Sequence, residues 1–201
     1  MVVVAGRTFR GQSADERRAT RRAQLLDAAL SVIGEDGWSA ATMTAICRRA
    51  GLTERYFYES FADREALYIA LIEALAAEVR DAVLGALATA PPQDRVRAVA
   101  AAVVGVLVAD PRKGRAAMLE GLGDERLARR RRDLFGSFEA LMREHAEAFG
   151  IPAAERELLA TASVGLTGEL ILRRLEGRLD LDDDALVDAI ASLALRLLGS
   201  K

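Results

Sequence analysis

Apolar residues recur at spacings of three and four along most of the chain, and no stretch alternates apolar and polar residues as a strand does. This period is that of amphipathic helices, and Ala, Leu, Glu and Arg, which favour helices, dominate the composition. With capping residues, glycine and proline as start and stop signals, the pattern predicts an all-α fold of about nine helices. The predicted helices cover residues 14–34, 43–50, 54–60, 63–88, 93–109, 111–120, 124–149, 152–177 and 182–198.

Two of the predicted helices are short and almost adjacent. Thr42 is the predicted N-cap of the first, Gly51 can adopt the left-handed conformation that ends it, and Thr53 is predicted to cap the second. Such a pair has the dimensions of a helix-turn-helix, whose second helix lies in the major groove of DNA. The apolar residues expected to anchor that second helix are Leu52, Phe57 and Phe61.

The remaining residues of the second helix are expected to face outward. They are Glu54, Arg55, Tyr56, Glu59 and Ser60. An arginine can donate two hydrogen bonds to guanine, and a tyrosine can contact phosphate or a thymine methyl group. The two glutamates would repel phosphate, so they are interpreted as solvated and stay outside the predicted DNA-binding site.

The charge is unevenly distributed along the chain. The net charge is −2, yet residues 1–22 hold six arginines and only two acidic residues. This local excess predicts a basic arm, including Arg7 and Arg10, that a polyanion would attract. A solvated tail without a partner is the alternative interpretation.

A set of residues between positions 22 and 67 also carries a family resemblance. The set comprises Gly37, Thr42, Ile46, Ala50-Gly51-Leu52-Thr53, Phe57-Tyr58, Phe61 and Arg64-Glu65-x-Leu67. In this combination the segment resembles the TetR family of bacterial repressors. The resemblance implies a helix-turn-helix DNA-binding domain of three helices at residues 1–62 and a helical effector-binding and dimerisation domain at residues 63–201.

The resemblance also implies roles for individual residues. Arg55 and Tyr56 occupy base-facing positions, and Tyr58 and Arg64 occupy positions that contact phosphate. The helix that Thr42 begins would start near a phosphate. The complete predicted DNA-binding set is Thr42, Thr53, Arg55, Tyr56, Tyr58, Arg64, Arg21 and Arg22.

Two departures from the family pattern restrict what the resemblance implies. Glu59 and Ser60 stand where many family members carry an aromatic residue and a histidine. Arg64 replaces the commoner lysine. The preferred DNA sequence is therefore not carried over from the family.

An apolar stripe in the longer carboxy-terminal part is expected either to line an effector cavity or to form plain core. Its mostly aliphatic character favours an apolar effector. The run Arg129–Arg132 spreads around a helix and is interpreted as a solvated face. The candidate lining residues, beside the inward-facing Leu127 and Leu134, are Leu71, Leu75, Leu107, Met118, Phe135, Phe138 and Met142.

The last two predicted helices carry further apolar stripes. The resemblance implies that they pair across a two-fold axis as a four-helix interface, and packing within one chain is the alternative. Gly165 and Gly168 stand where close approach would be possible. The candidate interface residues are Leu159, Ala162, Leu166, Leu170, Ile190, Leu193 and Leu197.

Other function classes are not favoured. Cys47 is the single cysteine, and no second His or Cys stands at ligand spacing from His145, so no metal or cofactor is expected. No nucleophile and base form a catalytic motif, which argues against an enzyme. The longest charge-free apolar stretch, residues 98–109, has twelve residues, and a membrane-spanning helix needs roughly 20. Because residues 2–6 are also too short for a signal peptide, a cytoplasmic protein is expected.

These features together predict a homodimeric transcriptional regulator. It would be a repressor that leaves a palindromic operator in double-stranded DNA when a small apolar effector binds. The alternative is a helical enzyme or small-molecule carrier that retains the helix-turn-helix shape without binding DNA. Specific DNA binding distinguishes the two hypotheses.

Overall fold

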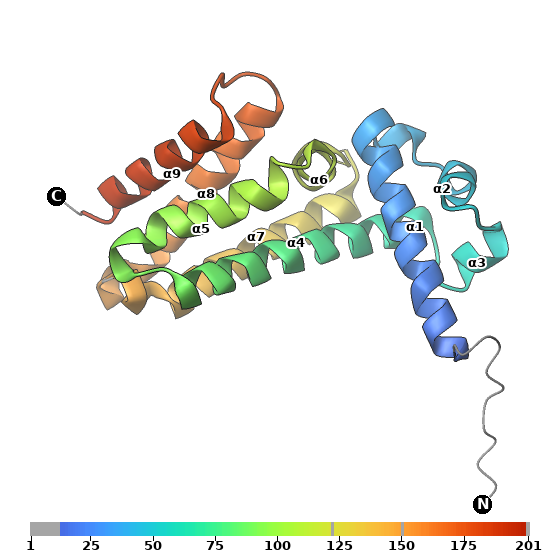
Figure 1. The fold of residues 1–201 in the computed structure, drawn as a ribbon, viewed down its shortest axis with the longest axis horizontal. Helices are drawn as coiled ribbons and strands as arrows, with labels where there is room; N and C mark the ends of the chain where they lie inside the picture. Colours follow the sequence, from blue (N-terminus) through green and yellow to red (C-terminus); the bar gives the residue numbers. More distant parts are fainter. Residues whose placement is uncertain (1–12, 122, 150, 200–201) are drawn as a thin grey trace, which may run out of the picture. The chain divides into compact units, whose positions relative to one another are not determined.

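The computed structural model describes residues 13–121, 123–149 and 151–199, and these residues are almost entirely helical (Figure 1). They form nine α-helices joined by short turns, without a strand in the described part, so the all-α prediction is confirmed. Contacts divide the chain into two compact units, residues 1–71 and residues 72–201. None of the described helices combines the length and the apolar character needed to span a bilayer.

The first unit contains α1 (Ala14–Asp36), α2 (Met43–Ala50), α3 (Glu54–Tyr58) and the first residues of α4 (Arg64–Thr89). These are the blue and cyan ribbons of Figure 1. Helix α1 packs against α2, which in turn packs against α3. The most deeply buried side chains of this core are Leu25, Ile33, Ile46, Phe57, Leu67 and Tyr68.

Local capping chemistry sets the start and end of these helices. The Thr42 hydroxyl accepts a hydrogen bond from the Ala45 amide at 3.1 Å, and Gly51 ends α2 at φ 66°, as the sequence predicts. Thr53 occupies the N-cap of α3, but its side chain makes no capping bond. The Tyr56 amide instead donates to the Thr53 carbonyl at 3.0 Å, because α3 starts as a tight turn.

The predicted domain boundary at residue 62 differs from the division between the two units. The first two turns of α4 belong to the first unit, where Leu67 and Tyr68 are fully buried. The Tyr68 ring stacks on Trp38, with 4.7 Å between the ring centroids. Helix α4 then continues without interruption into the second unit.

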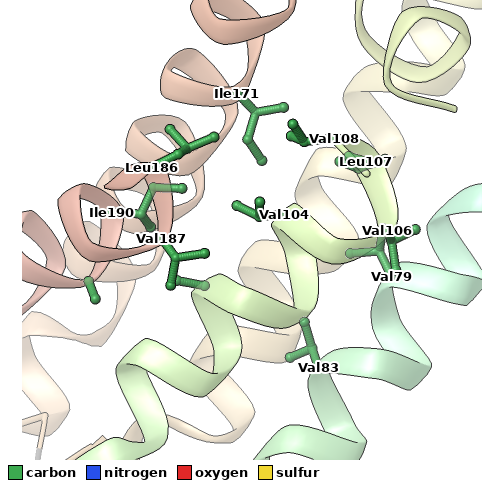
Figure 2. Close-up of a cluster of buried hydrophobic side chains, with 12 residues drawn as sticks. Val79, Val83, Val104, Val106, Leu107, Val108, Ile171, Leu186, Val187 and Ile190 are labelled. Atoms are coloured by element: carbon green, nitrogen blue, oxygen red, sulfur yellow. The ribbon is translucent and has the colours of Figure 1, made fainter. Parts of the chain in front are cut away.

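The second unit is a helical bundle built from the rest of α4, α5 (Arg95–Leu107), α6 (Pro111–Gly114), α7 (Glu125–Glu144), α8 (Arg156–Leu175) and α9 (Asp183–Leu197). Helix α5 packs most extensively against α9, and α7 packs against α8. Figure 2 shows valine, leucine and isoleucine side chains of α4, α5, α8 and α9 clustered around Val104, which is 2% exposed.

The largest differences from the predicted helix ends in this unit are at α6 and α7. A single helix is predicted over residues 111–120, whereas α6 passes at Gly114 into a π-helical turn, Arg115–Leu119. Helix α7 ends at Glu144 instead of 149, because His145 leaves the helical conformation at ψ 6°. A short 3₁₀ turn, Ala146–Phe149, then follows.

Gly114 of α6 packs tightly against residues of α5 and α8. A methyl group at this position would lie 2.2 Å from the Leu107 carbonyl oxygen and 2.8 Å from both methyl carbons of Leu175. The backbone there is ordinary right-handed helix, with φ −60°. Gly114 is therefore required for space and not for conformational freedom.

We expect Gly114→Ala to destabilise the second unit by about 1–3 kcal/mol, because the Leu107 carbonyl cannot yield without moving the end of α5. Gly85→Ala is the matched control, since Gly85 lies inside α4 with open space around it. The control should stabilise the protein by about 0.5–1 kcal/mol through helix propensity. Thermal unfolding followed by circular dichroism measures both, and a Gly114→Ala protein as stable as the wild type would contradict this packing.

Candidate nucleic-acid interface and ligand cavity

Helix α3 has only five residues and is held in place by aromatic side chains. Phe57 is completely buried and Phe61 is 6% exposed, and their ring centroids lie 5.9 Å apart. Leu52, in the turn that precedes α3, is half-buried. The expected anchoring of this helix is therefore seen in the structure.

The opposite face of α3 is open to solvent. The Arg55 side chain is 84% exposed, and Tyr58 is 60% exposed with its ring edge against Phe57. Thr53 and Glu54 are also exposed. This face presents a guanidinium and a phenol on a rigid support, which are groups that bind base edges and phosphate.

Tyr56 is half-buried and does not face outward as expected. The Arg21 guanidinium of α1 lies 4.4 Å from the centroid of its ring, a cation–π contact. Arg21 thus covers the ring of a predicted base-facing residue. The sequence does not reveal this contact, because 34 residues separate the two positions.

Glu59 accepts hydrogen bonds from three arginines of this surface. Its carboxylate accepts from Arg55 at 3.2 Å and from Arg21 at 3.4 Å, and its backbone carbonyl accepts from Arg18 at 2.8 Å. The sequence interpretation left Glu59 outside the DNA-binding set as a solvated residue, whereas its side chain is 35% exposed and paired with two arginines. The available signal was the Arg55–Glu59 spacing of four residues, which favours a pair on one helical face.

Arg64 and Arg22, also in the predicted DNA-binding set, belong to the first unit as well. The Arg64 guanidinium lies 4.4 Å from the Trp38 ring centroid, and its Nε donates to Glu65 at 3.1 Å. The Arg22 side chain is exposed beside Phe61, 5.1 Å from the ring centroid. Arg7 and Arg10, from the predicted basic arm, lie outside the described residues.

The exposed start of α2 adds a further favourable feature for an anion. Thr42 is exposed, and the first amide groups of this eight-residue helix carry partial positive charge. The Thr44 hydroxyl donates to Glu54 at 3.2 Å, which ties the starts of α2 and α3 together. The structure thus gathers hydrogen-bond donors from α1, α2 and α3 in one unit.

Cys47, on the buried side of α2, does not belong to this surface. Burial raises the pKa of its thiol, and the nearby Glu54 carboxylate raises it further. The thiol therefore stays protonated near neutral pH and is a poor nucleophile. Among the described residues, no three His, Cys, Asp or Glu side chains are placed to hold a metal ion.

A cavity of about 160 Å³ lies inside the second unit. Its wall is mostly aliphatic and aromatic and comes from α4, α5, α7 and α8 and from the π-helical turn. Six of the seven predicted lining residues are in this wall, while Leu71 is buried in the first unit. The six are Leu75, Leu107, Met118, Phe135, Phe138 and Met142.

The cavity wall also contains a residue that the sequence interpretation placed in solvent. Arg131, from the run expected to form a solvated face, is half-buried and lines the cavity. Its neighbours Arg129 and Arg130 form ion pairs with Glu125 and Glu73. The periodicity of one helix does not show which arginine turns inward, because that depends on the position of the π-helical turn.

The predicted interface residues of α8 and α9 have mixed environments. Ile190 is 3% exposed and belongs to the core of the second unit, so its side chain packs within the chain. Leu197 is 43% exposed, while Leu159, Ala162, Leu166, Leu170 and Leu193 are half-buried. Leu158 at 74% and Leu195 at 36% are also exposed on the same two helices.

Comparison with known proteins identifies the amino-terminal module. Residues 25–71 match the family model described as bacterial regulatory proteins, tetR family. The HTH-type transcriptional regulator BetI of Rhizobium meliloti (strain 1021) is 43% identical over 79 residues, which cover 39% of this chain and 39% of the relative. The matched part thus spans about two fifths of the length of this curated relative.

Solved structures share the fold over almost the whole chain. A TetR-like transcriptional regulator from Rhodococcus sp. RHA1 has a TM-score of 0.71 at 22% identity, covering 91% of this chain and 98% of its own. The regulator FadR from Bacillus subtilis, solved in complex with stearoyl-CoA, has a TM-score of 0.72 at 18% identity, with 86% and 96% covered. The helix-turn-helix segment of this chain thus matches the tetR family of bacterial regulatory proteins, and the chain shares its fold with the solved TetR-like regulator.

Proposed function

We propose that this protein is a homodimeric transcriptional repressor that leaves a palindromic operator when a small, largely apolar effector binds. The observation that carries the proposal is the exposed Arg55 on α3, a helix fixed from behind by the fully buried Phe57. A rigid helix with an exposed guanidinium is suited to reading guanine in the major groove.

In the proposed complex, α3 enters the major groove and the surrounding groups bind the backbone. Arg55 contacts a base edge, while Tyr58, Arg22 and Arg64 donate to phosphate oxygens. Thr42 and Thr53 stand at the starts of α2 and α3, and the start of α2 lies near a phosphate. Two copies of α3 about 34 Å apart would enter successive major grooves of a palindrome.

Arg21 and Arg55 can bind either to Glu59 within the protein or to DNA. In the free protein Glu59 neutralises part of the charge of Arg21 and Arg55. On the operator, Arg55 exchanges this exposed ion pair for guanine, a step that costs little because such pairs contribute about 0–1 kcal/mol. On other sequences the pair persists, so we propose that Glu59 favours specific over non-specific binding.

The proposed effector site is the cavity of the second unit. Helix α4 supplies part of its wall, including Leu75 and Val79, and the same helix carries Arg64 in the first unit. An effector that favours one position of α4 would change the spacing of the two α3 helices and lower DNA affinity. The binding of stearoyl-CoA by FadR of Bacillus subtilis supports an apolar ligand for this fold.

The proposed dimer interface is the apolar surface of α8 and α9. Leu158, Leu195 and Leu197 expose large side chains there. Burial of such leucines against a second copy would release water from apolar surface, which stabilises a dimer. This set retains Leu197 from the sequence prediction and replaces Ile190, which packs inside the chain.

A small-molecule carrier that does not bind DNA is the alternative, because the apolar cavity alone suits that role. Selection of bound fragments from a random DNA pool, followed by mobility shift at several salt concentrations, tests the regulator. We expect a palindromic site that survives competitor DNA and an affinity that falls steeply with salt. Absence of any enriched sequence would favour the carrier.

On the selected site, Arg55→Ala should lose about 1–3 kcal/mol of discrimination at one base pair in each half-site. Tyr58→Phe is the matched comparison, because it removes only a hydroxyl from a side chain that is already exposed. It should weaken binding to all sequences equally. An Arg55→Ala protein with unchanged sequence preference would show that Arg55 does not read a base.

Glu59→Gln should release Arg21 and Arg55 and remove a negative charge from the surface. We expect binding to random-sequence DNA to tighten by about two- to tenfold, with a smaller gain on the operator. Glu35→Gln is the control, because it removes the same charge from an exposed pair with Arg49 outside the proposed contacts. If both variants gain the same affinity for DNA, Glu59 acts only by repelling the phosphates and not through its pairs with Arg21 and Arg55.

Sedimentation velocity should show the wild-type protein at twice the mass of one chain. Leu158→Glu combined with Leu197→Glu should produce a folded monomer, since both side chains are exposed in the single chain. Ala140→Glu places a charge on the exposed surface of α7 and should leave the dimer intact. If the double variant stays dimeric, the dimer interface must lie on another surface.

A further inference from the structure

Arg131 is the one arginine of the run Arg129–Arg132 that lines the cavity of the second unit. The other polar residues in the wall are His145, Ser163 and Thr167. All remaining lining side chains are apolar, apart from Gly168. A cationic group therefore lies beside a space that otherwise favours hydrocarbon.

The Arg131 guanidinium is held in position by backbone carbonyls. Its Nε donates to the Ala117 carbonyl at 3.0 Å, and its Nη2 donates to the Glu120 carbonyl. Both carbonyls come from the π-helical turn and its end. These bonds orient the planar group, but neutral carbonyls do not supply a full counter-charge.

Arg131 lacks the acidic partner that such a position ordinarily requires. Within the described residues, no carboxylate lies within 4.0 Å of its nitrogens, and its Nη1 is buried without a hydrogen-bond partner. A buried donor left unpaired destabilises a protein, and a poorly compensated charge does so more strongly. An anionic oxygen placed in the cavity beside Arg131 would supply the missing counter-charge.

The size of the cavity restricts the rest of the ligand. A protein cavity of about 150 Å³ with an apolar wall holds a molecule the size of benzene. The present volume of about 160 Å³ thus suits a single ring or a chain of medium length. A coenzyme A nucleotide is far larger than this volume and would have to lie outside it.

We propose that the cavity binds a small monocarboxylate whose carboxylate accepts hydrogen bonds from Arg131. Its hydrocarbon part packs against Phe135, Phe138 and Met142. An arginine fork matches a carboxylate better than any neutral acceptor. The assignment rests on the proposed function of the cavity as the effector site and specifies the chemistry of the effector.

The test is isothermal titration of the full chain with octanoate and with octanamide, which has the same chain and no charge. The wild-type protein should bind octanoate at least about tenfold more tightly. Arg131→Gln should abolish this preference. Arg132→Gln, which neutralises the exposed neighbouring arginine, should keep it.

Two further variants separate ligand binding from damage to the fold. Arg131→Lys keeps the charge without the fork and should retain part of the preference for octanoate, whereas a merely structural Arg131 would give no graded response. Gly168→Ala should weaken both ligands, because its methyl would lie 3.1 Å from Phe135 Cε1. Circular dichroism confirms that each variant is folded.

Equal affinity of the wild-type protein for the two ligands, or an unchanged preference in Arg131→Gln, would overturn the assignment. Binding of stearoyl-CoA without binding of octanoate would also overturn it, in favour of a long thioester. Because titration uses the protein without DNA, its result is independent of the regulator hypothesis. If octanoate binds through Arg131 and operator affinity does not change, the ligand assignment stands and regulation by this ligand fails.

Discussion

Helix α3 has a single hydrogen-bonded turn, and a peptide of five residues does not stay helical in water. Its shape is imposed from outside, by the burial of Phe57 against the first unit and by the left-handed Gly51 that brings α2 and α3 together. For Arg55 to read a base as proposed, its backbone must be fixed before DNA binds, because ordering it afterwards would use up binding free energy. The exposed face that carries Arg55 thus depends on the apolar packing of Phe57 on the opposite face of α3.

The cations of the first unit are organised by a neighbouring acid. Glu59 pairs with Arg21 and Arg55, and Arg21 covers the Tyr56 ring. Such a surface attracts a polyanion less strongly than the same arginines would without Glu59. In the proposed DNA-binding role, this arrangement favours selectivity over non-specific attraction, since each non-specific contact must first displace an internal partner.

The predictable parts of this structure are those that local chemistry decides. Helix periodicity and caps such as Thr42 depend on residues three or four positions apart, so the sequence predicts them well. Arg131 and Ile190 were misplaced because each was judged from its own helix, whereas their environments depend on distant segments. The same is true of Tyr56, whose ring is covered from α1. Distant contacts of this kind leave no periodic signal in a single chain.

The side chains that line the cavity all belong to the second unit, and the Arg55 surface belongs entirely to the first. At Gly168, a single methyl group would already press on Phe135. Under the proposed function, a few substitutions at such positions after gene duplication could alter the effector while the copies still recognise one promoter. Natural selection could then change the ligand of such a regulator without changing its DNA-binding surface.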